Sequence, residues 1–320
     1  RAPWLASMDT DQTDCFRLLH GSAEGAPGVT VDRYGPVLLV QTWRDPLDPG
    51  EIDAIAAIVE PVFPGLIPVW NNRRAGRRKG ERRDFAIDHD PELPEHCVGR
   101  ELGISYDVTP RHRGRDPLLF LDFRAGRRHV AAHSPGRTVL NLFAYTCGMG
   151  VVSAAAGASE VLNVDFASSA LDVGATNAAL NDVHMDLLHA DCLPVIRQFA
   201  GLPPGGRRGR RPDYAKVDAR QWDLVVLDPP RWARSAFGAV DVVRDYPTLF
   251  KPTVLATREG GNILATNNVA SVEWEEWVDV LERCASKAGR PLQSLERIEV
   301  DPDFPTPDGR SPLKMAWITV

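Results

Sequence analysis

Acidic residues close several short apolar segments in the C-terminal two-thirds of the chain. Asp165 ends the segment EVLNVD, Asp191 ends DLLHAD and Asp228 ends WDLVVLD. Each segment precedes a helical stretch, a pattern typical of a parallel sheet that is buried on both faces. Because ligands bind at the carboxyl ends of such strands, we expect these carboxylates to meet at one edge of the sheet.

Two of these carboxylates fit a bound nucleoside. Asp165 can accept hydrogen bonds from both hydroxyls of a ribose, and Asp191, followed by Cys192, is placed to accept one from an adenine amino group. A single acid at the end of a strand is more often a helix N-cap. Three acids in the expected order favour ligand binding over capping.

Glycines and prolines shape two further loops of this edge. The segment from Asn141 to Gly150 carries glycines that allow a ligand to approach the backbone closely. Its spacing differs from G-x-G-x-x-G, which argues against a nicotinamide-dependent dehydrogenase. Asp228 is followed by Pro229 and Pro230, which fix a rigid turn and prevent an early start of the next helix. This turn would direct a carboxylate and carbonyl groups into the site.

The elements that position these residues predict a doubly wound α/β fold with a mostly parallel, seven-stranded sheet, similar to a Rossmann fold. We expect its parallel strands at 138–144, 160–165, 186–191, 222–228 and 261–266. The intervening helices are expected at 150–158, 168–182, 193–201, 246–260 and 273–289. Segments 292–300 and 313–320 are predicted to pair as a closing hairpin, which gives a mixed sheet.

The N-terminal part has a different pattern. Between Cys15 and Trp43, β-branched and aromatic residues alternate with turn residues, which indicates short antiparallel strands. A helix over 50–63 and a strand over 66–70 follow. We therefore predict a small α+β domain with its connection at 1–110 and a larger domain at 111–320.

Composition narrows the class of protein. The chain has 320 residues, 43% of them hydrophobic, and a net charge of −6, which disfavours purely electrostatic binding of nucleic acid. Its five cysteines form no CxxC pair, and no histidine cluster has the spacing of metal ligands, so neither a disulfide framework nor a metal site is expected. Without a membrane span or signal peptide in the sequence, we expect a cytoplasmic protein.

With these motifs in place, the sequence resembles class I S-adenosylmethionine-dependent methyltransferases. More narrowly, it is similar to bacterial large-subunit ribosomal RNA methyltransferases that modify cytosine C5 or guanine N7. The narrower resemblance is carried by Arg17 to Gly35, Phe120 to Arg124, the segment LNLFAYTCGMG and the segment LDPPRW.

The resemblance implies S-adenosylmethionine as cofactor and ribosomal RNA as partner. The cofactor-binding residues that it implies are Asp122, Arg124, Asn141, Phe143, Tyr145, Thr146, Gly148, Asp165, Phe166, Asp191, Cys192 and Asp228. Phe123 replaces the glutamine of the family segment FLDQR, and Arg124 has an ion pair between domains as its alternative role.

One departure from the family concerns the reaction. Methylation of cytosine C5 requires a cysteine thiolate that adds to C6 of the base. The family cysteine of the C5 enzymes corresponds to Asn268, and an amide cannot form that adduct. The stretch TNNV instead resembles S-N-N-K of the guanine-N7 enzymes, where transfer requires mainly alignment of the nitrogen with the methyl group. We therefore favour a ring nitrogen as the acceptor.

In this hypothesis Asp228, Pro229 and Pro230 position the base, and Asn267 and Asn268 read its edge or support the turn. Substrate contacts are expected from Trp232, Arg231, Arg77 and Arg78, with Arg73, Arg74 and the loop at 207–211 as further basic residues. The alternative role of Trp232 is that of a core residue. Two other functions remain open: methylation of a small molecule or protein, and cofactor or RNA binding without catalysis.

Overall fold

The structure is a computed structural model that describes Trp4, Met8 and residues 11–73, 87–89, 93–110, 116–205, 214–235, 238–306, 308 and 310–320. The chain forms two compact units. Unit 1 contains Arg1–Arg124 and Asp301–Arg310, and unit 2 contains Ala125–Val300 and Ser311–Val320. The division therefore follows Arg124 and not residue 110, where the sequence predicts it. The physical reason is a buried ion-pair cluster that includes Arg124 in unit 1.

Unit 1 is built on a five-stranded sheet of order β1-β2-β3-β4-β5. Its strands are β1 (Cys15–His20), β2 (Val29–Tyr34), β3 (Val37–Thr42), β4 (Ile67–Asn72) and β5 (Ile87–His89). The first three pair antiparallel, as the turn residues between them predict, whereas β3 and β4 pair in parallel across helix α2 (Pro49–Val59). A separate hairpin joins β6 (Val98–Glu101) to β7 (Ile104–Asp107). The described part of the unit also contains two short 3-10 helices, η1 (Gly21–Glu24) and η2 (Leu121–Phe123).

Helix α2 covers one face of this sheet. Asp48 caps the helix through a reciprocal capping box with Glu51, which satisfies backbone N–H groups that a first helical turn leaves free. The helix buries Ile52 against Leu38 and Val40 of β3. These two β3 residues point to the same face of the strand, so their neighbours Leu39 and Gln41 occupy the opposite face.

Unit 2 contains a seven-stranded sheet of order β10-β9-β8-β11-β14-β16-β15, which confirms the predicted fold class. The strands are β8 (Thr138–Leu142), β9 (Glu160–Asp165), β10 (Asp186–His189), β11 (Trp222–Leu227), β14 (Thr257–Asn267), β15 (Ser294–Ile298) and β16 (Lys314–Thr319). The first five in the order are parallel, and β16 runs antiparallel to both neighbours. A two-stranded ribbon joins β12 (Trp232–Ser235) and β13 (Gly238–Asp241).

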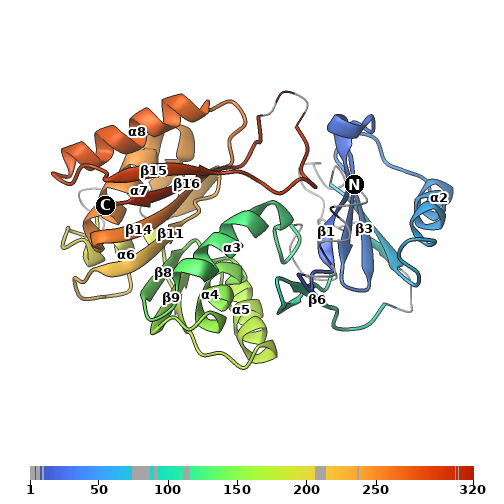
Figure 1. The fold of residues 1–320 in the computed structure, drawn as a ribbon, viewed down its shortest axis with the longest axis horizontal. Helices are drawn as coiled ribbons and strands as arrows, with labels where there is room; N and C mark the ends of the chain where they lie inside the picture. The colour runs from blue at the N-terminus through green and yellow to red at the C-terminus, as the bar shows by residue number, and fades with distance from the viewer. Residues whose placement is uncertain are drawn as a thin grey trace. The chain divides into compact units, whose positions relative to one another are not determined.

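Six helices flank the large sheet in the described part of unit 2 (Figure 1). They are α3 (Arg124–His133), α4 (Gly148–Ala155), α5 (Ser168–Leu180), α6 (Cys192–Phe199), α7 (Val242–Ala256) and α8 (Trp274–Lys287). Helices α6, α7 and α8 pack in succession, and α4 packs against α5. On the face of α3, His129 and His133 lie against the ring of Trp317 from β16. Within the described residues no helix is long and apolar enough to cross a membrane.

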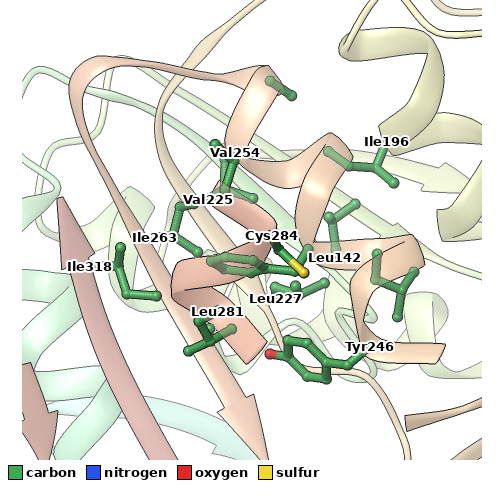
Figure 2. Packing of buried hydrophobic residues seen from close by; sticks show 14 of the residues in the cluster. Leu142, Ile196, Val225, Leu227, Tyr246, Val254, Ile263, Leu281, Cys284 and Ile318 are labelled. Atoms are coloured by element: carbon green, nitrogen blue, oxygen red, sulfur yellow. The ribbon is translucent and has the colours of Figure 1, made fainter. Parts of the chain in front are cut away.

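The main core of unit 2 lies between the sheet and helices α6 to α8. Figure 2 shows Leu142, Val225 and Ile263 of three adjacent strands facing Ile196 of α6 and Leu281 of α8. Every one of these side chains is fully buried. Burial of Leu, Val or Ile side chains contributes about 1.5–3 kcal/mol each, so this core supplies the rigid platform on which the strand ends are fixed.

Candidate active site at the carboxyl edge of the large sheet

The parallel strands of unit 2 end at one level. Leu142 of β8 pairs with Val164 of β9 and with Leu227 of β11, and Leu227 pairs with Ala265 of β14. The strand order reverses between β8 and β11, which is the switch point where open α/β sheets bind ligands. The loops that follow these strands carry most of the residues singled out in the sequence.

The loop after β8 has an unusual backbone. Phe143, Tyr145 and Cys147 all have positive φ, at 58°, 50° and 61°. This conformation costs a residue other than glycine roughly 1–2 kcal/mol. Such backbone persists where surrounding contacts enforce it, and it is found mainly at functional sites.

Asp165 makes one of the contacts that hold this loop. Its Oδ2 accepts a hydrogen bond of 2.8 Å from the backbone N–H of Tyr145, and its Oδ1 accepts one of 2.8 Å from Ala167. Burial raises the pKa of this carboxyl group, while the backbone donors act in the opposite direction. The next residue, Phe166, is 57% exposed. An acceptor pair and an exposed aromatic ring therefore lie at the end of β9.

Asn141 lies below the loop and is 2% exposed. Its Nδ2 donates to Oδ1 of Asn163 at 2.8 Å. A Cβ atom on Gly150 would meet that same oxygen at 2.1 Å, so helix α4 approaches the sheet at a point that only glycine permits. The predicted residue Asn141 thus supports the loop from beneath. Gly148 begins α4, and Thr146 is buried with its carbonyl accepting from Nδ2 of Asn177.

Asp191 combines the two roles that the sequence leaves open. Its Oδ1 caps helix α6 by accepting from the N–H of Leu193 at 2.9 Å. Its Oδ2 is buried and has no hydrogen-bond partner among the residues that the structure describes. An unpaired buried acceptor is costly, so this atom is a candidate ligand contact. The adjacent Cys192 accepts from the N–H of Phe143 at 3.2 Å and joins this loop to the first one.

The turn after β11 is connected to the end of β14. Thr266 donates its hydroxyl hydrogen bond to Oδ1 of Asp228, and the carbonyl of Thr266 accepts from Tyr246 at 2.9 Å. Pro229 is buried and Pro230 is half-buried. This network holds the Asp228 carboxylate in one orientation.

Asn267 and Asn268, which follow the strand predicted at 261–266, differ in burial. Asn267 is 1% exposed, and its Oδ1 accepts from the N–H of Val269 at 2.9 Å, so it supports the turn. Asn268 is exposed.

Arg124 forms the ion pair that the sequence offers as its alternative role, here within unit 1. Its guanidinium is fully buried and donates to Asp303 at 2.9 Å, to Asp301 at 3.1 Å and to the carbonyl of Cys15 at 3.2 Å. Glu101 lies 3.4 Å away. Asp122, which the sequence groups with Arg124, lines a cavity of unit 1.

The predicted substrate residues fall into three groups. Arg231 is exposed after the Asp228 turn, and Trp232 begins strand β12, where the structure describes its backbone. Arg73 pairs with Asp116 in unit 1. Arg77 and Arg78 lie outside the described residues, as do Arg74 and the loop at 207–211.

The five cysteines are free thiols, and all of them are buried. Burial raises the pKa of Cys147 and Cys192, which opposes formation of a thiolate. In the described part of the chain, no group of three or more His, Cys, Asp or Glu side chains could hold a metal ion.

Comparison with known sequences assigns the family. The sequence model of the S-adenosylmethionine-dependent methyltransferases matches residues 16–318. The chain belongs to this family. This methyltransferase is 26% identical over 307 residues to ribosomal RNA large subunit methyltransferase I of Vibrio parahaemolyticus, covering 93% of this chain and 72% of the relative. It is 30% identical over 293 residues to a ribosomal RNA large subunit methyltransferase of Deinococcus radiodurans, covering 91% of this chain and 68% of the relative.

Solved structures share the fold of this methyltransferase. SMU.776, crystallised with SAH, superposes with a TM-score of 0.79 at 23% identity and covers 100% of this chain and 78% of its own. A SAM-dependent methyltransferase of Agrobacterium tumefaciens superposes with a TM-score of 0.65 at 18% identity, covering 95% of this chain and 89% of its own. The seven-stranded sheet with its N-terminal domain is therefore a fold found among methyltransferases.

The edge of the sheet fits S-adenosylmethionine. The unpaired Oδ2 of Asp191 can accept from the adenine amino group, and the oxygens of Asp165 have lone pairs for ribose hydroxyls. The N-terminus of α4 at Gly148 favours negative charge, such as the carboxylate of the methionine part. When bound, the cofactor supplies an electrophilic methyl group.

Sequence reasoning missed the residues that support the site. Asn163 and Asn177 are fully buried behind the loop, and Thr266 orients Asp228. The signal for the asparagines was a polar residue inside an apolar strand or helix, as in EVLNVD, because a buried amide must be hydrogen-bonded.

Proposed function

We propose that this methyltransferase modifies a base of ribosomal RNA, and that the acceptor is a ring nitrogen, guanine N7. The observation that carries the choice of atom is the absence of a usable thiol. All five cysteines are buried, and the position of the C5-specific cysteine is the exposed Asn268. Methylation at cytosine C5 needs a thiolate that reaches the base, whereas guanine N7 has an in-plane lone pair and no proton to remove.

The choice of ribosomal RNA rests on the relatives. Two large-subunit ribosomal RNA methyltransferases align with more than nine-tenths of this chain. The fold also hosts other substrates, so a small molecule or a protein is the competing substrate class.

We infer the cofactor contacts from the site. Asp165 would accept from the ribose, and Asp191 from the adenine, with Phe166 against the adenine ring and Cys192 fixing the loop. Phe143, Tyr145, Thr146 and Gly148 would surround the methionine part, supported from below by Asn141. Arg124 and Asp122 are not included, because the Arg124 guanidinium pairs with Asp303 of unit 1 and Asp122 lines a cavity of that unit.

The chain's part in the reaction is alignment. The Asp228 carboxylate, held by Thr266, and the carbonyl of Pro229 would position the base, with Asn268 at its edge and Trp232 and Arg231 as further contacts. Asn267 would hold the turn in shape. Alignment of two reactants can lower a barrier by roughly 7–11 kcal/mol. Because guanine N7 carries no proton, the protein does not have to transfer one. Arg77 and Arg78 would bind RNA phosphates.

The test is to incubate the protein with methyl-labelled S-adenosylmethionine and separate pools of ribosomal RNA, transfer RNA and protein, followed by nucleoside analysis. We expect label in 7-methylguanosine of ribosomal RNA. Label in 5-methylcytidine would refute the acceptor atom, and label in protein alone would refute the substrate.

Asp228→Ala tests the role of the turn in the same assay. It should abolish transfer while cofactor binding is kept, and Asp218→Ala, at an exposed position, is its control. A parallel loss of cofactor binding would refute the role given to Asp228.

A further inference from the structure

Unit 1 contains a cavity on the sheet face opposite helix α2. It has a volume of about 130 Å³, and Arg17, Gln41, Trp43, Phe120 and Asp122 line it. Helix α2 packs on the other face of the sheet, against Leu38 and Val40. The cavity is therefore a feature separate from the hydrophobic core of this unit.

The floor of the cavity carries an unused hydrogen-bond acceptor. Gln41 is 3% exposed, and its Nε2 donates to Oδ2 of Asp32 at 3.4 Å. This contact fixes the orientation of the amide, because a reversed amide would bring its oxygen against the carboxylate. Oε1 of Gln41 has no hydrogen-bond partner among the described residues. A ligand that donates an N–H group would satisfy it.

The charges around the cavity disfavour a phosphate as that ligand. Arg17 is engaged by Asp32 through two contacts, at 2.7 and 3.1 Å, and by His20 at 2.8 Å. Arg73 pairs with Asp116. Asp122 also lines the cavity and interacts electrostatically with Arg17, so acidic side chains offset both described arginines and leave little positive charge to attract an anion.

Aromatic rings supply the remaining surface. Trp43 is 43% exposed and Phe120 is 42% exposed, although large rings are usually covered. The guanidinium of Arg17 lies 4.6 Å from the centre of the Phe304 ring, which also lines the cavity. Exposed rings next to amide and carboxylate acceptors are the groups with which proteins hold unpaired bases of RNA.

We propose that this cavity binds one unpaired nucleobase of the RNA substrate, and that the base carries an amino group. The ring stacks on Trp43 or Phe120, and its N–H donors face Oε1 of Gln41 and the Asp122 carboxylate. Adenine, cytosine and guanine have an amino group with two N–H donors for these two acceptors, whereas uracil has a single ring N–H. This inference rests on the proposed function, because it takes RNA as the substrate.

Equilibrium binding of fluorescein-labelled single-stranded RNA pentamers, measured by anisotropy, tests it. The wild-type protein should bind oligoadenylate and oligocytidylate more tightly than oligouridylate. Trp43→Ala should weaken binding about tenfold, and Trp43→Phe should restore most of it. Ile58→Ala is the control, since Ile58 is 76% exposed on α2.

Gln41→Met provides a readout that a structural role alone would not change. It removes the acceptor at nearly constant volume, so it should remove the preference over oligouridylate without weakening binding of oligouridylate itself. Retained preference in Gln41→Met, or Trp43→Ala binding as tightly as Ile58→Ala, would overturn the proposal.

The methyl-transfer assay separates this proposal from the proposed function. If ribosomal RNA is methylated but Trp43→Ala changes neither pentamer binding nor KM, the function stands and the cavity proposal fails. If pentamers bind through Trp43 and Gln41 but no RNA is methylated, the cavity proposal stands and the function fails.

Discussion

The hydroxyl of Thr266 donates a hydrogen bond to Oδ1 of Asp228, and this contact joins the end of β14 to the turn after β11. The two residues are 38 positions apart in the chain. Thr266 is fully buried and Asp228 is half-buried, so the contact is partly shielded from water. A shielded hydrogen bond to a carboxylate fixes its direction, and Asp228 is the residue to which we assign positioning of the base.

Thr266→Val should therefore lower kcat about tenfold, because a hydrogen bond to a charged group contributes roughly 1.5–3 kcal/mol. The affinity for S-adenosylmethionine should change little, and Thr266→Ser should restore kcat. Thr253→Val is a matched control, since Thr253 is also buried and its hydroxyl donates to the Leu249 carbonyl of its own helix. Equal kcat values for the two valine variants would contradict the role of Thr266.

Asp165 should make cofactor binding dependent on pH. Burial raises the pKa of this carboxyl group above its ordinary value of 3.8. The ionised carboxylate would accept hydrogen bonds from the loop and from the ribose. The affinity for S-adenosylmethionine should therefore fall as the pH falls through the raised pKa, at a higher pH than for an ordinary aspartate.

Calorimetric titration with S-adenosylmethionine from neutral to mildly acidic pH measures this effect. Asp165→Asn should weaken binding about tenfold or more and flatten the pH profile, while Asp186→Asn, whose side chain is 62% exposed, should behave as the wild type. An unchanged profile in Asp165→Asn would assign the pH dependence to another group.

Gly150→Ala should disturb the cofactor loop from below. The added Cβ would lie 2.1 Å from Oδ1 of Asn163, a side chain held by Asn141. Overpacking of this kind costs about 1–3 kcal/mol, and we expect weaker cofactor binding together with a lower free energy of unfolding. Gly50→Ala in α2, where the nearest atom is 3.2 Å away, should lose less of both. Cofactor binding at wild-type strength in Gly150→Ala would show that the loop does not depend on this contact.

The fold could be predicted from the sequence because each strand is marked by a local pattern of apolar residues. The segment EVLNVD coincides with β9 itself, and the closing hairpin pairs as expected. Helix α3 was not predicted, because its buried face uses Arg124 and Arg127 and lacks the apolar period that identifies a helix.

The site was predictable only in part, for a similar reason. Carboxylates that follow parallel strands lie at one edge of the sheet, so the positions of Asp165, Asp191 and Asp228 could be predicted, while their roles stay predictions. The partners of Arg124, by contrast, are Asp301 and Asp303, which lie 177 and 179 positions away, so no local sequence pattern indicates them.

Arg124→Met tests how much the ion-pair cluster around Arg124 contributes to the free energy of unfolding. Removal of the guanidinium takes the buried positive charge away from the carboxylates of Glu101 and Asp303, which should lower the free energy of unfolding by about 3–5 kcal/mol. Chemical denaturation measures the loss. Arg220→Met, which breaks an exposed pair with Glu160, should cost no more than about 1 kcal/mol. Similar small losses in both variants would mean that the cluster is not a stabilising element of unit 1.

The central claim is that this methyltransferase modifies a nitrogen and not cytosine C5. Methylation at C5 must expel the hydrogen of that carbon, so ribosomal RNA transcribed with cytidine tritiated at C5 provides a direct test. We predict methyl incorporation, recovered as 7-methylguanosine, with no release of tritium to water. Release of tritium in proportion to methyl incorporation would contradict the claim and would require a thiol nucleophile that the five buried cysteines do not offer.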